Sequence, residues 1–185
     1  MRRATPSLLG VLALLLVSAV SASAGAAEPT GNATLVISAA KARLLAEREI
    51  GVEGIRGAES EGRETRLQVG GGTIGAASAT LATEGGLRFA VGDGKARRVA
   101  RLTGFVVELG PDARLSARLN GGKRRTVFEL VSRPGGFVSD AAKGIAQLHG
   151  ARLIWRRSVA RALSRRLGAN VPRGPLGRIR VSAAT

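Results

Sequence analysis

The chain has 185 residues and a formal net charge of +16, with one histidine, one tryptophan, no tyrosine and no cysteine. Without cysteine it has no disulfide, no thiolate metal site and no cysteine nucleophile, so an extracellular fold must be held by packing alone. The excess of arginine has two interpretations: the composition bias of a GC-rich genome, or a polyanionic partner such as a wall polymer, nucleic acid or anionic lipid.

The first residues have the layout of a secretory signal peptide. Arg2 and Arg3 precede an apolar run over residues 8–20, and small residues suited to a signal peptidase follow at 22–24. The apolar run is shorter than the roughly 20 residues that a spanning helix needs, which favours cleavage over a retained anchor. We therefore predict a signal peptide over residues 1–24 and an exported protein with no membrane span after cleavage.

A linker over residues 25–33 and a single domain over residues 34–182 are expected next. The domain opens with a short strand, and helical spacing of apolar residues then predicts a helix over Ala39–Ile50. Ser38 stands at the N-cap position of this helix, and Gly51 fits its end.

Two glycine-rich segments follow this helix. Residues 52–64 are rich in glycine and glutamate but lack the fixed spacing of a calcium loop, so we expect a solvated connector. Gly70, Gly71 and Gly72 follow a first strand. A phosphate-cradling loop would need a helix after it, whereas residues 73–81 have the pattern of another strand, so we predict a turn at the three glycines.

Residues 81–131 carry the clearest structural signal in the chain. Apolar and polar residues alternate, and Gly92-Asp93-Gly94 and Asn120-Gly121-Gly122 provide hairpin turns. The residues expected on one face are Leu87, Phe89 and Val91, then Phe105, Val107 and Leu109, then Leu115, Ala117 and Leu119. The fold class predicted is mainly β, an antiparallel sandwich or barrel-like meander flanked by two short α-helices.

The last third returns to a strand over Ile145–Trp155, a helix over Ser158–Leu167 and a final strand over Leu176–Val181. LVISAAKARLLAER from Leu35 aligns without a gap to LIWRRSVARALSRR from Leu153. We expect two similar strand–helix units flanking the meander, with a chance match in an Ala-, Leu- and Arg-rich chain as the alternative.

The basic residues are concentrated in this last third, where no acidic residue follows Asp140. The arginines on one face of the predicted helix, which we take as candidate polyanion-binding residues, are Arg157, Arg161, Arg165 and Arg166. Proteins that bind nucleic acid combine such charge with stacking aromatic side chains. Only Trp155 is available and its strand face indicates core, so we expect a cell-wall polymer or another anionic surface rather than a specific nucleic acid.

The sequence resembles the HtaA domain family of exported proteins from high-GC Gram-positive bacteria, over roughly residues 34–181. The segments that carry the resemblance are GGLRF at Gly85–Phe89, LTGFVVELG at Leu102–Gly110, ARLSARLNGG at Ala113–Gly122 and TVFEL at Thr126–Leu130. The resemblance implies a largely antiparallel β domain with short helices. It also implies a secreted or surface haem-binding module that acts in haem uptake.

The resemblance further implies that haem is held by a tyrosine from the N-terminal helical region and a histidine just after the Gly–Phe strand. This chain has no tyrosine, and Gly92 stands at the expected histidine position. Haem iron needs an axial donor such as His, Tyr, Met or Cys, and after signal cleavage only His149 remains. We expect the fold without this iron ligation and no cofactor, with His149 as the candidate haem ligand if haem is bound.

The residues also favour a non-enzymatic protein. Serine catalysis would have to use His149, and no serine lies in a nucleophile-elbow sequence. Zinc hydrolysis lacks ligands, and no aromatic sugar platform accompanies the carboxylates. The leading hypothesis is a secreted HtaA-like domain that acts as a binding or structural module of the cell envelope. The alternatives are a haem-transport protein with divergent ligation and a polyanion-binding wall protein.

Overall fold

The computed structural model describes residues 27–185, so the expected signal peptide lies outside the described residues. The strands are β1 (Thr30–Ile37), β2 (Ile50–Ile55), β3 (Glu59–Glu61), β4 (Glu64–Ile74), β5 (Ala79–Thr83), β6 (Gly86–Val91), β7 (Arg98–Leu109), β8 (Arg114–Leu119), β9 (Arg124–Val131), β10 (Phe137–Asp140), β11 (Ile145–Trp155) and β12 (Pro175–Ala184). The helices are α1 (Ala39–Ala46) and α2 (Arg157–Leu167), with a 3₁₀ turn η1 (Gly94–Ala96).

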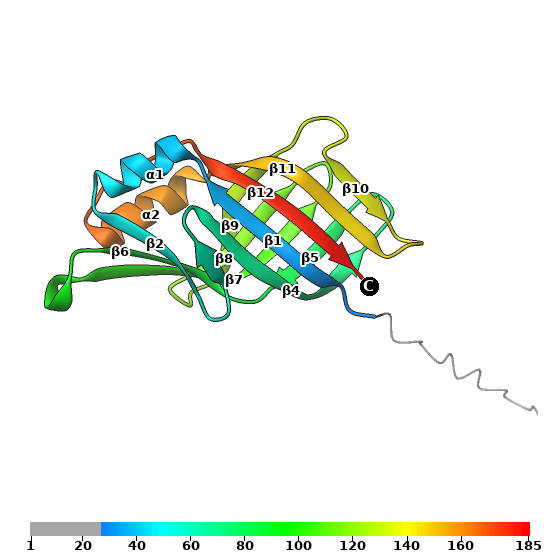
Figure 1. Cartoon of the computed structure of the whole chain (residues 1–185), viewed down its shortest axis with the longest axis horizontal. Coiled ribbons are helices and arrows are strands. Elements are labelled where there is room, and N and C mark those ends of the chain that lie inside the picture. Colours follow the sequence, from blue (N-terminus) through cyan, green and yellow to red (C-terminus); the bar gives the residue numbers. More distant parts are fainter. Residues whose placement is uncertain (1–26) are drawn as a thin grey trace, which may run out of the picture.

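The strands form one antiparallel sheet that closes on itself. Its order runs β7, β5, β4, β1, β12, β11, β9, β8, and β8 pairs again with β7 (Figure 1). Closure leaves the ring itself without the free edges that an open sheet would present to other chains. This ring confirms the mainly β, barrel-like antiparallel fold with two short helices that the alternating pattern predicts.

The long strand β7 changes partner along one edge. Its first half, from Arg98 to Thr103, pairs with β6, and its second half, from Val106, pairs with β5. Gly104 lies between the two halves with a φ of 59°, a conformation that glycine adopts at no steric cost. As a result, β6 and its partner β2 extend from the ring as an arm of the sheet.

Both helices lie at one end of the ring, beside this arm (Figure 1). The Ser38 side chain accepts a hydrogen bond from the backbone N–H of Lys41 and so caps α1, as expected. Gly168 ends α2 in the left-handed conformation. Helix α2 contacts β6 and β7, and α1 contacts β2. No helix within residues 27–185 combines the length and apolar character needed to cross a membrane.

Several predicted boundaries between residues 25 and 83 are wrong. Strand β1 begins at Thr30, inside the expected linker, because it pairs along its whole length with β12 and, as far as Val36, with β4. Helix α1 ends at Ala46, and Gly51 belongs to β2. The expected connector over residues 52–64 is also largely strand, because β2 pairs with β6 and β3 pairs with β4. In each case the long-range pairing decides the conformation.

The three glycines at 70–72 are not a turn but an irregularity within β4, where the register to β5 shifts between Val69 and Gly71. The turn comes later, where the Gly75 N–H donates to the Ser78 carbonyl at 2.8 Å. Gly72 has a φ of 136°, and a Cβ there would lie 2.0 Å from the Thr80 carbonyl oxygen. The two strands approach each other so closely at this position that only glycine fits without a clash.

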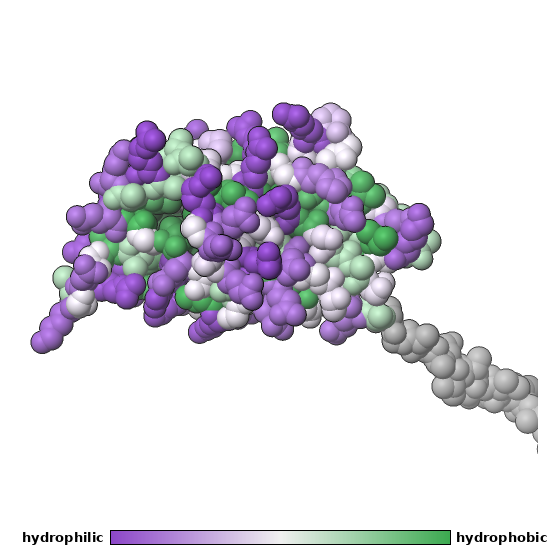
Figure 2. Space-filling view, viewed as in Figure 1, coloured by the Kyte–Doolittle hydropathy of each residue, from purple (hydrophilic) through white to green (hydrophobic). Residues whose placement is uncertain are grey.

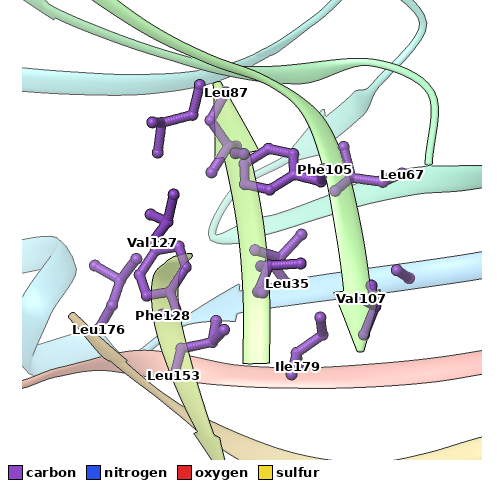
Figure 3. Close-up of a cluster of buried hydrophobic side chains, with 14 of the residues drawn as sticks. Leu35, Leu67, Leu87, Phe105, Val107, Val127, Phe128, Leu153, Leu176 and Ile179 are labelled. Atoms are coloured by element: carbon purple, nitrogen blue, oxygen red, sulfur yellow. The ribbon is translucent and has the colours of Figure 1, made fainter. Parts of the chain in front are cut away.

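Apolar side chains fill the ring and the space beneath the helices. Phe128 and Trp155 pack with ring centroids 4.2 Å apart, and Phe89 lies 6.0 Å from Trp155. Figure 3 shows Phe128 among Val127, Leu153 and Leu176. Helix α2 covers this cluster with residues that are fully buried, among them Val159, Leu163 and Leu167. Trp155 is thus a core residue, as its strand face indicates.

The two strand–helix units of the aligned segments both exist, as β1–α1 and β11–α2. Leu35 and Leu153 are equivalent buried strand residues, and Leu45 and Leu163 are equivalent buried helix residues. The two units are close together in the sheet, because β1 and β11 lie on either side of β12 and both pair with it. Both helices consequently lie at the same end of the ring (Figure 1).

Candidate functional site

The family resemblance assigns the haem ligands to the N-terminal helical region and to the position of Gly92, and in the structure these two regions are connected through β2. The end of α1 leads through a turn into β2, and Ile50 of β2 pairs with Val91 of β6, directly before Gly92. Gly92 has a φ of 72° and opens the loop to η1. Arg48, in the turn that follows α1, donates through Nη1 to the Asn170 carbonyl at 2.6 Å. None of these residues offers an axial donor to iron, so the donor set at this place does not fit haem.

His149 lies elsewhere, on β11. By the shorter path across the sheet, β7, β8 and β9 separate β6 from β11. The register of β11 against β12 shifts between Leu148 and Ala151, and Gly150 has a φ of 76°, which together define a β-bulge. The His149 N–H donates to the Gly136 carbonyl at 2.8 Å, and its side chain is exposed. His149 is therefore a surface residue of the outer face of the ring.

The arginines of α2 divide into two groups. Arg157, Arg161 and Arg165 are exposed, and none of the three forms an ion pair with another described residue. Arg166 points away from them, and its Nε donates to the Val99 carbonyl at 3.4 Å. Val99 lies before the part of β7 that pairs with β8, so Arg166 contacts the β7 backbone where β8 does not pair with it. The structure thus brings three of the four predicted residues onto one open face and gives the fourth a contact to β7.

The acidic side chains with altered pKa values are partners in ion pairs. A hydrogen bond from Arg88 lowers the pKa of Glu53, and Arg97 lies 3.6 Å from the same carboxylate. Arg114 Nε donates to Glu108 at 2.7 Å and lowers the pKa of that carboxyl. A general acid at neutral pH needs a raised pKa, whereas these carboxylates are held ionised. Within residues 27–185 no three His, Cys, Asp or Glu side chains gather to hold a metal ion.

A hollow of about 590 Å³ lies on the outer face, where β1, β4, β11 and β12 run side by side below the start of α1. A second hollow of about 450 Å³ adjoins it, since Gly150, Arg152 and Arg178 line both. Figure 2 views the molecule from this side and shows less polar surface between scattered hydrophilic side chains. We call the two hollows together the outer groove. Arg152 and Arg178 belong to the basic last third of the chain, but the sequence does not single them out, because their proximity depends on strand register.

No model of a known protein family matches the chain, and no curated protein matches its sequence. Three solved structures from Corynebacterium glutamicum are similar. The C-terminal domain of HtaA aligns with a TM-score of 0.64 at 14% identity, covering 85% of this chain and 97% of that chain. The N-terminal domain of HtaA gives 0.60 at 10% identity, covering 83% and 96%, and the heme binding protein HtaB gives 0.56 at 13%, covering 85% and 93%. The chain therefore has an HtaA-like domain fold.

Proposed function

We propose that this protein is an exported, non-enzymatic binding module of the cell envelope that uses the HtaA-like fold to hold an anionic polymer instead of coordinating haem iron. The observation that carries the proposal is the exposed face of Arg157, Arg161 and Arg165, which has no acidic partner within the described residues. We call these three residues the helix face.

The spacing of the helix face suits a chain of anionic groups. Residues four apart on a helix lie about 5–6 Å from each other at Cβ, so the three guanidiniums follow one another along α2. Arginine binds phosphate and carboxylate groups through a planar fork of donors. The buried side of α2, with Val159, Leu163 and Leu167 in the core, holds this row in place.

Haem coordination is the alternative, because one of the similar structures is a heme binding protein. The position between the end of α1 and Gly92 has no donor for iron, which supports the anionic polymer instead. Haem binding in this chain would have to use His149, on a different part of the sheet.

The first experiment measures retention on immobilised heparin, a sulfated polymer, as a function of salt. The wild-type protein is expected to need well over physiological salt for elution. The variant Arg157→Gln/Arg161→Gln/Arg165→Gln should elute at much lower salt. The slope of its affinity against salt concentration should correspond to roughly two to three fewer released counterions, since each contact to an anionic group releases about one.

A matched variant, Arg118→Gln/Lys123→Gln/Arg125→Gln, removes the same charge from exposed positions around the β8–β9 turn. It should keep most of the retention. Equal loss in the two triple variants would show that only net charge matters, and elution of the wild type at low salt would rule out a polyanion partner.

A further inference from the structure

The outer groove has a feature that the helix face does not have: two arginines placed directly opposite each other. Arg152 of β11 and Arg178 of β12 are register partners across the two strands. Like charges directly opposite each other on neighbouring strands destabilise a sheet. Neither guanidinium forms an ion pair with another described residue.

The neighbouring charges leave this pair uncompensated. Glu64 is the one carboxylate that lines the larger hollow, and Arg180 lies 3.5 Å from it. Arg63 also lines this hollow and donates through Nη1 to the Ile37 carbonyl at 3.1 Å. The charge of Glu64 is therefore already matched, and the groove keeps an excess of positive charge around Arg152 and Arg178.

The same hollow has an apolar side. Val36 of β1 is the register partner of Arg178 on the other side of β12 from Arg152. Together with Val36, the residues Ala39, Pro175 and Gly177 line the hollow between β1, α1 and β12. The backbones of β1 and β12 approach so closely here that a Cβ on Gly177 would lie 1.9 Å from the Val36 carbonyl oxygen. Small side chains and close strands therefore leave a shallow apolar floor beside the two arginines.

The bulge in β11 shapes the other end of the groove. Gly150 has no side chain to fill the space next to Arg152, and His149 and Arg133 line the second hollow from the far side. Bulges occur preferentially next to binding sites, where they redirect side chains and leave the regular pairing. The groove thus has an apolar half and a basic, polar half, joined at Arg152 and Arg178.

We propose that the outer groove binds a small organic acid with an apolar body, its carboxylate, phosphate or sulfonate group between Arg152 and Arg178 and its apolar part over Val36, Ala39 and Pro175. An anionic group between the two guanidiniums relieves their mutual repulsion and accepts charge-assisted hydrogen bonds from both. The apolar floor then favours an amphiphilic acid over a bare inorganic anion. This site is separate from the helix face and does not depend on it.

The test uses the fluorescent acid 1-anilinonaphthalene-8-sulfonate, which combines a sulfonate with an aromatic body. The protein is expected to enhance its fluorescence with saturable binding to the folded state, monitored well below the unfolding temperature. Laurate should displace it, whereas dodecanol, which lacks the charge, and inorganic phosphate, which lacks the apolar part, should not. Displacement by phosphate alone would replace the proposal with a simple anion site.

Two groove variants and one control decide the location. Arg152→Gln/Arg178→Gln should weaken binding at least tenfold, and Val36→Glu, which places a carboxylate beside Arg178, should do the same without removing an arginine. The variant Arg157→Gln/Arg161→Gln loses the same charge on the helix face and should bind the dye as the wild type does. Unchanged binding in both groove variants would overturn the proposal, whatever the outcome on heparin.

Discussion

Replacing Phe128 with alanine is expected to lower the free energy of unfolding by about 3–5 kcal/mol, the usual cost of removing a large buried aromatic side chain. Phe128 is fully buried, and its ring packs 4.2 Å from that of Trp155 between the end of the ring and α2. The cavity left behind would open the cluster that joins the helices to the sheet. Urea unfolding followed by Trp155 fluorescence and by circular dichroism measures the loss.

The matched control is Phe137→Ala on β10, a half-buried phenylalanine at the edge strand that pairs only with β11. This substitution should lower the free energy of unfolding by clearly less than Phe128→Ala does, since fewer contacts are lost and solvent can reach the site. A similar effect of the two substitutions would mean that the Phe128–Trp155 cluster is not the centre of the core.

A second large effect is expected for Gly72→Ala. Its φ of 136° is strained for an L side chain, and the new Cβ would lie 2.0 Å from the Thr80 carbonyl oxygen. Strain in such a region costs about 1–3 kcal/mol, and the backbone of β5 would also have to move. We expect a loss of at least about 2 kcal/mol in the free energy of unfolding, measured by thermal and urea denaturation.

The comparison for this variant is Gly51→Ala in β2. Gly51 has no positive φ, and the nearest atom to an added Cβ, the Ala90 carbonyl oxygen, is 3.8 Å away. This substitution should change stability little. If Gly72→Ala lowered the free energy of unfolding as little as Gly51→Ala, the close approach of β4 and β5 in the structure would be incorrect.

The elements with a strong local pattern could be predicted from the sequence. The strand over Ile145–Trp155 has the predicted bounds, and the Asn120-Gly121 turn lies between β8 and β9 with positive φ at both residues. The segment over residues 52–64 was missed because its glycines and glutamates have low strand propensity, and pairing of β2 with β6 overrides that propensity. Local pattern is decisive only where the long-range pairing agrees with it.

The candidate sites also combine features that the local sequence predicts with features that depend on long-range pairing. The row of Arg157, Arg161 and Arg165 follows from helical periodicity and is visible in the sequence. The contact from Arg166 to Val99 is not, because the two residues are 67 positions apart. The opposition of Arg152 and Arg178 depends on the register of β11 against β12, including a bulge, and short-range periodicity carries no signal for it.

The proposed loss of iron coordination can be tested most directly by titrating the purified protein with hemin and recording the Soret band. With no donor between the end of α1 and Gly92, we expect no spectrum of a coordinated complex, in the wild type and in His149→Ala alike. A saturable Soret shift that disappears in His149→Ala would contradict the proposal and establish haem ligation by His149.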